Sequence, residues 1–202
     1  MNMAAPRWQR RPQSRRDELL DAATRLLQDQ PLDAIKVSDI TDAAGTAKGT
    51  FYTYFATKAD LYEALNRRYL DGLVEAMDQA RANQTNGGWF ERQDAAFAAV
   101  IAYMYERDDL IEVWAREGNG DACGDVFASG LERIAEGFAL EIEEAVASGQ
   151  ARCDDPLATA LLIAHAVDGL VGADMMMAGS RRTLGAKRVT AAAQAMVRKL
   201  LT

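Results

Sequence analysis

The chain has 202 residues, of which 49% are hydrophobic and 26% are charged, and its formal net charge is −7. These proportions are ordinary for a soluble globular protein, and the length suits one core or a small domain fused to a larger one. Polar residues interrupt the longest apolar stretch, Leu157 to Met177, and no apolar run follows the basic N-terminus, so we expect neither a membrane span nor a secretory signal.

The negative charge is unevenly distributed along the chain. Residues 1–60 carry nine Lys or Arg and eight Asp or Glu, whereas residues 61–202 carry fourteen and twenty-two. Five arginines and no acidic residue fall within the first sixteen positions. Any basic surface is therefore local and N-terminal, and the acidic bulk of the protein lies elsewhere.

Three short helices are expected within the first 55 residues. Leucine and alanine recur on one helical face between residues 19 and 27, and Ser14 stands where it could cap that helix. A second helix, from about Val37 to Ala44, is followed by Gly45, which suits a left-handed C-cap. The third covers about Lys48 to Phe55. Short helices joined by a glycine turn describe a helix-turn-helix, whose last helix would lie in the DNA major groove.

The stretch GTAKGTFYTYFATK, residues 45–58, concentrates aromatic residues, glycine and lysine. Phe51 and Phe55 are four apart and can both face the core, so the residues between them must face outward. Exposed aromatic area is costly on a plain surface, but Tyr52 and Tyr54 make sense if each hydroxyl donates to a phosphate oxygen.

Two further residues of this stretch fit contact with DNA. Gly49 lets the backbone approach a groove edge where a side chain would collide. Lys58 would place a cation beside the free N–H groups of the next helix, an arrangement that suits a phosphate. The alternative is an ordinary, well-packed helix corner.

The segments RRDELLDAATRLL, VSDITDAAGTAKGTFYTYF and ATKADLY, together with the specific pattern G-T-x-Y-x-Y-F-x-x-K, carry a family resemblance. From Arg16 to Leu61 the chain resembles the DNA-binding domain of the tetracycline-repressor (TetR) family. The rest matches only in helix count and order. The resemblance implies an all-helical, cytoplasmic homodimer that binds double-stranded DNA, represses transcription and responds to a small molecule through its C-terminal domain.

The resemblance also implies which residues contact DNA. Bases are approached by Lys48, Gly49, Thr50 and Thr53. Phosphates are gripped by Ser38, Tyr52, Tyr54 and Lys58. Ala47 stands where the family commonly has a Ser or Thr cap, so the recognition helix is expected to begin uncapped unless Thr46 substitutes. Thr53 is also shorter than the polar residue often found at its position.

An arginine-rich arm, residues 1–13, precedes the expected domain of residues 14–60. One hypothesis is that Arg10, Arg11, Arg15 or Arg16 reaches phosphates or an adjacent minor groove, as basic arms do in other helix-turn-helix proteins. The alternative is a solvated, flexible tail that adds only non-specific attraction.

Residues 61–202 are expected to form an effector-binding and dimerisation domain. Thr57 and Asp60 form a T-x-x-D capping pattern at the start of a long helix, in which leucine, tyrosine and methionine recur every fourth residue. Apolar periodicity marks further helices around Phe97–Met104, Leu110–Trp114, Phe127–Val146, Pro156–Ala178 and 188–201. The whole chain is therefore predicted to be all-α, with about nine helices.

The last two helices are apolar around much of their circumference. Antiparallel association with the same pair of a second chain would form a four-helix bundle, and the alternative is a core within one chain. A cavity between helices, where bundle proteins hold ligands, could be lined by Trp89, Phe97, Tyr103, Met104, Trp114, Phe127, Leu131, Ile134 and Phe138. Glu112, Glu117 and Asp121 form either a solvated acidic face or a feature that favours a cationic ligand.

Catalytic and metal-binding patterns are absent from the sequence. His165 is the only histidine, it has no accompanying nucleophile motif, and it could bond to Asp168 one helical turn away. Cys123 and Cys153 lack CxxC spacing, which argues for a reducing compartment and against a zinc site. We therefore expect no enzyme, cofactor or metal. The main hypothesis is a ligand-responsive repressor that binds a palindromic operator, and the alternative is a ligand-independent architectural or partner-binding protein on the same fold.

Overall fold

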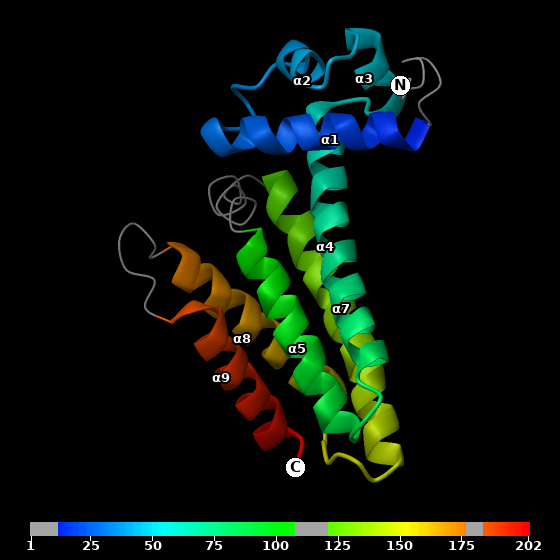
Figure 1. Ribbon diagram of the computed structural model, residues 1–202, viewed down its shortest axis with the longest axis vertical. Coiled ribbons are helices and arrows are strands. Elements are labelled where there is room, and N and C mark those ends of the chain that lie inside the picture. The colour runs from blue at the N-terminus through cyan, green and yellow to red at the C-terminus, as the bar shows by residue number, and fades with distance from the viewer. Residues whose placement is uncertain (1–11, 108–120, 177–183) are drawn as a thin grey trace, which may run out of the picture. The chain divides into compact units, whose positions relative to one another are not determined.

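The computed structural model describes residues 12–107, 121–176 and 184–202, whose regular secondary structure is helical throughout (Figure 1). The helices are α1 (Pro12–Asp29), α2 (Val37–Ala43), α3 (Lys48–Tyr54), α4 (Lys58–Asn83), α5 (Trp89–Glu106), α7 (Asp121–Ala147), α8 (Pro156–Met176) and α9 (Gly185–Leu200). The predicted all-α class is confirmed. The short helix expected at Leu110–Trp114 and the arm of residues 1–11 lie outside the described residues.

The chain divides into two compact units, residues 1–65 and residues 66–202. The division falls inside α4, so this helix begins in the N-terminal unit and continues into the C-terminal one. The boundary expected after residue 60 lies in the same helix.

The N-terminal unit is a three-helix arrangement in which α1 packs against α2 and α2 against α3. Its helix α1 begins at Pro12, so Ser14 lies inside the helix and the expectation that Ser14 caps it was wrong. The described large hydrophobic side chains of this unit that are at most 4% exposed are Leu19, Leu20, Leu27, Ile35, Ile40, Phe51, Phe55, Leu61, Tyr62 and Leu65.

The turn between α2 and α3 is a Schellman motif centred on Gly45. Gly45 has a positive φ of 63°, and its N–H donates to the carbonyl of Asp42 at 3.1 Å. The N–H of Thr46 donates to the carbonyl of Thr41 at 2.9 Å. These two bonds satisfy the last carbonyls of α2 and require the left-handed conformation that glycine adopts without strain. The predicted glycine C-cap is confirmed.

The capping predictions for the next two helices are also confirmed. Ala47 precedes α3 and provides no side-chain cap, and Thr46 does not replace it. At the start of α4, the N–H of Thr57 donates to the Asp60 carboxylate at 2.8 Å, and the N–H of Asp60 donates to the Thr57 hydroxyl at 3.1 Å. This reciprocal pair is the capping box expected from the T-x-x-D pattern.

In the C-terminal unit, α8 packs against α7 and α9, and α5 packs against α9 and α8 (Figure 1). From α4, the buried residues Tyr69, Leu73 and Met77 join the core of this unit. An aromatic cluster adds specific packing, because Phe138 of α7 stacks parallel to Trp89 at 6.3 Å and meets Phe97 edge-on at 5.7 Å.

A buried carboxylate fixes the beginning of α9. Asp174, at the C-terminal end of α8, is 2% exposed and accepts a hydrogen bond from the Tyr105 hydroxyl at 2.6 Å. It also accepts from the N–H groups of Leu184 at 3.0 Å and Gly185 at 2.9 Å. Buried charge is tolerated only when donors surround it, so this aspartate ties α5, α8 and the N-terminus of α9 together.

A second polar cluster joins α4, α5 and α7. Gln93 is 2% exposed and donates to the Glu141 carboxylate at 2.9 Å, while Arg81 forms an ion pair with the same carboxylate at 3.2 Å.

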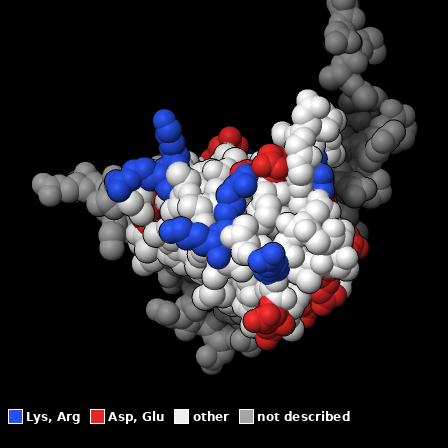
Figure 2. Space-filling model, turned by 90° about the horizontal axis from the view of Figure 1, so that it is seen from below, with Lys and Arg blue, Asp and Glu red and all other residues white. Residues whose placement is uncertain are grey.

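On the surface, Figure 2 shows Lys and Arg side chains near the middle of one face and Asp and Glu toward its edges. On this face, therefore, the charge of the acidic chain does not form a continuous negative surface.

Candidate DNA-binding face and ligand cavity

Helix α3 presents a polar face to solvent and an aromatic face to the core. Phe51 is fully buried and Phe55 is 4% exposed, whereas Tyr52 is 54% exposed. Tyr54 is half-buried and Thr53 is exposed. The orientation predicted from the four-residue spacing of the phenylalanines is therefore confirmed.

Gly49, near the start of α3, is not required to be glycine by any contact with the described residues. A Cβ atom added at this position would meet no atom within 4 Å, and the backbone does not have a positive φ. Glycine in a helix nevertheless costs about 1 kcal/mol relative to alanine. The residue therefore fits a surface that something outside the chain approaches closely.

The other polar residues around this face differ in how far their side chains are free to contact DNA. Lys48 is exposed and makes no hydrogen bond or ion pair within the described residues, and Thr50 is half-buried. Thr53 donates its hydroxyl to the carbonyl of Gly49 at 3.2 Å, which leaves its oxygen lone pairs free to accept from a base. The Ser38 hydroxyl, in α2, lies 3.4 Å from the Asp39 carboxylate.

Lys58 differs from these residues because its ammonium is already occupied. The Nζ atom donates to the carbonyl oxygens of Leu32 and Ile35, each at 2.7 Å, and to that of Asp33 at 3.3 Å. An ammonium has three protons, so all of them have acceptors inside this unit. The expected phosphate contact has not been tested, but the geometry favours a different role, which is to hold the loop between α1 and α2 against the start of α4.

Of the four arginines proposed to reach DNA from the N-terminus, the structure describes Arg15 and Arg16. Both belong to α1 rather than to a flexible arm. Arg15 forms an ion pair with Glu18 at 2.9 Å, and the Arg16 guanidinium lies over the Phe55 ring at 5.6 Å. Both anchors fix these side chains on the N-terminal unit. A contact between either arginine and DNA stays a prediction.

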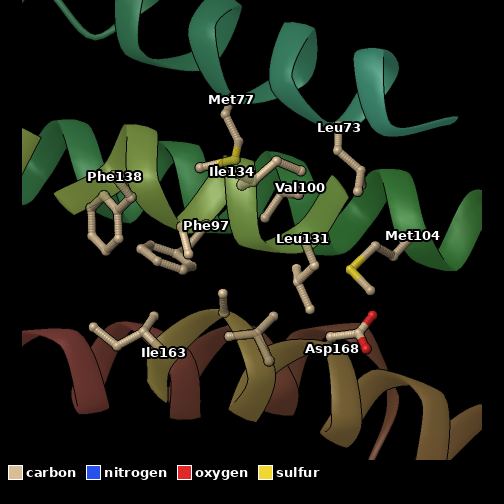
Figure 3. A pocket seen from close by; sticks show the side chains of 13 residues that line it. Leu73, Met77, Phe97, Val100, Met104, Leu131, Ile134, Phe138, Ile163 and Asp168 are labelled. Carbon is tan, nitrogen blue, oxygen red and sulfur yellow. The ribbon is translucent and has the colours of Figure 1, made fainter. Parts of the chain in front are cut away.

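The C-terminal unit contains a small cavity of about 60 Å³ between α4, α5, α7 and α8 (Figure 3). The apolar residues that line it are Leu73, Met77, Phe97, Val100, Met104, Leu131, Ile134, Ala135, Phe138, Ile163, Ala164 and Val167. Asp168 is the one ionisable side chain among the described residues of its wall. The cavity is therefore suited to a hydrophobic group and is smaller than a pocket that holds a drug-sized ligand.

Five of the predicted pocket residues line this cavity, namely Phe97, Met104, Leu131, Ile134 and Phe138. Two more of the predicted residues are not among those that line it. Trp89 stacks on Phe138 and lines a separate surface hollow, and Tyr103 packs beside Tyr69 with ring centroids 5.6 Å apart. Trp114 and the Phe127 side chain lie outside the described part of the chain, as do Glu112 and Glu117.

The sequence interpretation missed the contributions of α4 and α8 to the cavity. Leu73 and Met77 had been recognised only as the buried stripe of a long helix, and Ile163 and Val167 only as part of an apolar segment. Asp168 interrupts that apolar segment, and this polar residue was the signal that could have revealed the contribution of α8 to the cavity.

The charge of Asp168 is poorly compensated by the protein. Burial raises the pKa of its carboxyl, and the nearby His165 opposes this shift only in part. No hydrogen bond or ion pair to Asp168 occurs within the described residues, so the bond that His165 could have made does not form. Burial also raises the pKa of the Tyr69 hydroxyl, and the negative charge of Asp168 raises it further.

One face of α8 is not covered by any other described part of the chain. Leu162 is 57% exposed and Met176 is 69% exposed, and a Cβ added to Gly169 or Gly172 would meet no atom within 4 Å. Among the described residues, α8 alone is long and apolar enough to cross a membrane by length and composition, and 22% of its apolar window is buried. Several large apolar side chains of α8 are thus exposed in a single chain.

The N-terminal unit is a helix-turn-helix domain, and the C-terminal unit is a helical bundle with an apolar cavity, a pairing that defines a class of one-component DNA-binding regulators. Residues 19–65 match the model for bacterial regulatory proteins of the tetR family. Residues 116–202 match the C-terminal domain of AefR-like transcriptional repressors. The chain belongs to the TetR family of transcriptional regulators.

Curated relatives carry related descriptions. The HTH-type transcriptional repressor KstR2 of Mycolicibacterium smegmatis is 42% identical over 113 residues, which are 56% of this chain and 54% of that protein. The HTH-type transcriptional activator FasR of the same organism is 36% identical over 90 residues, which are 45% of this chain and 40% of that protein. The chain thus spans about half or less of the length of these curated relatives.

Solved structures share the fold. SmeT, the repressor of the Stenotrophomonas maltophilia multidrug efflux pump SmeDEF, has a TM-score of 0.74 and 17% identity, with 93% of this chain and 90% of that one covered. A transcriptional regulator from Aquifex aeolicus has a TM-score of 0.66 and 11% identity, with 92% and 98% covered. The family and these relatives are transcriptional regulators rather than enzymes.

Proposed function

We propose that this protein is a cytoplasmic, homodimeric transcriptional repressor that binds a palindromic operator and is released by a small molecule. The observation that carries the proposal is the outward face of α3, where an unrequired helical glycine lies between exposed Lys48 and exposed Tyr52. Glycine lowers the stability of this helix but leaves its backbone uncovered, and a tyrosine and a lysine beside it are exposed to solvent. Such a surface is suited to the edge of a DNA groove.

The contacts proposed for this face divide by chemistry. Lys48, Thr50 and Thr53 would read base edges, because ammonium and hydroxyl groups match the donor and acceptor pattern of the major groove. Tyr52, Tyr54 and Ser38 would donate to phosphate oxygens, which position the domain without reading the sequence. Arg15 and Arg16 would add attraction at the flank of this face. Lys58 would support the domain from within.

Homodimerisation is proposed through α8 and α9. The exposed apolar residues of α8 and its two glycines with open space beside them suit close packing against the same helices of a second chain. Two recognition helices related by a twofold axis would then read a palindrome. This association would cover the exposed apolar surface of α8, so that surface can be explained without insertion into a membrane.

Release by a ligand is proposed to act through α4. This helix contributes Leu73 and Met77 to the cavity, and its first residues belong to the DNA-binding unit. A ligand larger than the cavity would displace these side chains and so favour a different position of the helix. The extent of release is limited by the preference of the ligand for that second arrangement.

The test is to recover bound genomic fragments with the tagged protein and to titrate one of them against a random fragment of equal length. We expect tighter binding to the recovered fragment and an affinity that falls steeply with salt. Equal and negligible binding of both fragments at low salt would refute the proposal. A reporter behind the recovered site distinguishes repression from activation. The alternative of a ligand-independent architectural protein is not favoured, because the relatives are named as transcriptional repressors and activators.

A further inference from the structure

The cavity wall has one feature that hydrophobic packing does not explain. Thirteen residues line the cavity, and twelve of them are apolar. Figure 3 shows the Asp168 carboxylate beside Met104 at one end of this wall. A carboxylate at the edge of an apolar cavity costs free energy unless a donor meets it.

The protein itself supplies no such donor among its described residues. Burial raises the pKa of Asp168, and the neighbouring His165 lies on the exposed side of α8. Burial raises the pKa of the nearby Tyr69 hydroxyl, the Asp168 charge and Tyr103 raise it further, and Arg107 lowers it. Among the described residues, therefore, no hydrogen bond or ion pair compensates this carboxylate at the end of the apolar cavity.

We propose that the cavity binds a hydrophobic amine, whose hydrocarbon part fills the apolar chamber and whose protonated nitrogen donates to Asp168. Both an ammonium and a hydroxyl can donate a hydrogen bond to the carboxylate, but only the ammonium brings a full positive charge, so its attraction to Asp168 is stronger. A carboxylic acid of the same length is repelled. The proposal gives a chemical class to the effector proposed above, and depends on that role only for its consequence at the DNA.

The size of the cavity adds a second requirement. Because it measures about 60 Å³, only a short chain enters without rearrangement. Met77 and Met104 line it from two different helices, and the unbranched thioether side chain of methionine adapts readily to a new neighbour. Longer amines should therefore bind by displacing these side chains, which is the change that would be transmitted along α4.

The experiment measures binding of n-hexylamine, 1-hexanol and hexanoate to the full chain by calorimetry and thermal shift, without DNA. At neutral pH a primary amine is protonated, as lysine is. We expect the amine to bind about tenfold more tightly than the alcohol, and hexanoate not to bind. Equal binding of amine and alcohol, or tighter binding of the alcohol or acid, overturns the proposal using the unmodified protein alone.

Two variants sharpen the result. Asp168→Asn keeps the shape of the side chain and should abolish the preference for amine over alcohol. His165→Gln, on the exposed side of the same helix, should retain that preference. Preference for the amine that persists in Asp168→Asn contradicts the proposal. DNA affinity measured in parallel distinguishes the proposed ligand from the proposed release of DNA. Amine binding that leaves DNA affinity unchanged would refute release by the ligand, and the assignment of the ligand class would still hold.

Discussion

The ammonium of Lys58 donates a hydrogen bond to the carbonyl oxygen of Ile35 at 2.7 Å, and bonds to Leu32 and Asp33 use its other two protons. The lysine that most resembles a phosphate ligand in the sequence is thus a link inside the N-terminal unit. It holds the segment that follows α1 at the beginning of α4, close in sequence to the recognition helix.

Lys58→Met is expected to lower the stability of the N-terminal unit by about 2 kcal/mol, because charge-assisted bonds to carbonyls are lost. The slope of log affinity for DNA against log salt should not change, since no phosphate contact is removed. Thermal unfolding and salt titrations measure the two effects separately.

Lys48→Met is the matched control, because Lys48 is exposed and carries the same charge. It should leave the unfolding temperature unchanged and weaken DNA binding. If the Lys58→Met protein had normal stability and a smaller salt slope, that result would support a phosphate contact by Lys58 and contradict its internal role.

Gly49→Ala is expected to separate folding from DNA binding. The added methyl group meets no protein atom within 4 Å, and alanine favours the helix by about 1 kcal/mol, so the free protein should become no less stable. Operator affinity should fall by about tenfold or more, which corresponds to ~1.4 kcal/mol. Anisotropy titrations and thermal unfolding provide the measurements.

Gly137→Ala in α7 offers a comparison, because a Cβ there also meets nothing within 4 Å and the residue belongs to the C-terminal unit. Its DNA affinity should match that of the unmodified protein. If both variants bind the operator equally well, α3 does not approach DNA at Gly49.

Leu162→Asp is expected to produce a monomer. Leu162 is 57% exposed on α8, so the change costs the single chain little, but it places a charge in the proposed interface. Light scattering coupled to size-exclusion chromatography reports the mass. Leu140→Asp, at a 62% exposed position of α7, should remain dimeric. A Leu162→Asp protein that is still a dimer would place the interface elsewhere.

Asp168→Asn is expected to stabilise the ligand-free protein at neutral pH. Because the folded pKa of Asp168 is raised, the folded state holds this proton more tightly than the unfolded state. The benefit of the protonated carboxyl is complete below the unfolded pKa of about 3.9 and is lost as the pH rises through the raised folded value. Asparagine does not titrate, so its advantage should grow over that interval.

Unfolding temperatures of the two proteins between acidic and neutral pH test this prediction, and only their difference matters, because other carboxyl groups titrate in both. A constant difference across the range would mean that the folded state leaves the pKa of Asp168 at its ordinary value.

The sequence alone determined the local features of this protein. The burial of Phe51 and Phe55, the outward position of Tyr52, the glycine turn at Gly45 and the capping box of Thr57 all depend on residues within one or two helical turns. Helical periodicity and capping chemistry are written in such short spacings, so they could be predicted without a fold.

Only the tertiary structure decided which distant residues meet. Lys58 reaches carbonyls more than twenty positions earlier, and α4 and α8 bring Met77 and Asp168 to one cavity. Periodicity identifies the buried face of a helix but not the helix that it faces, because that choice depends on how all the helices pack together. For the same reason, only the packed structure shows that Trp89 stacks on Phe138, that Tyr103 packs beside Tyr69, and that a carboxylate lies at the edge of the cavity.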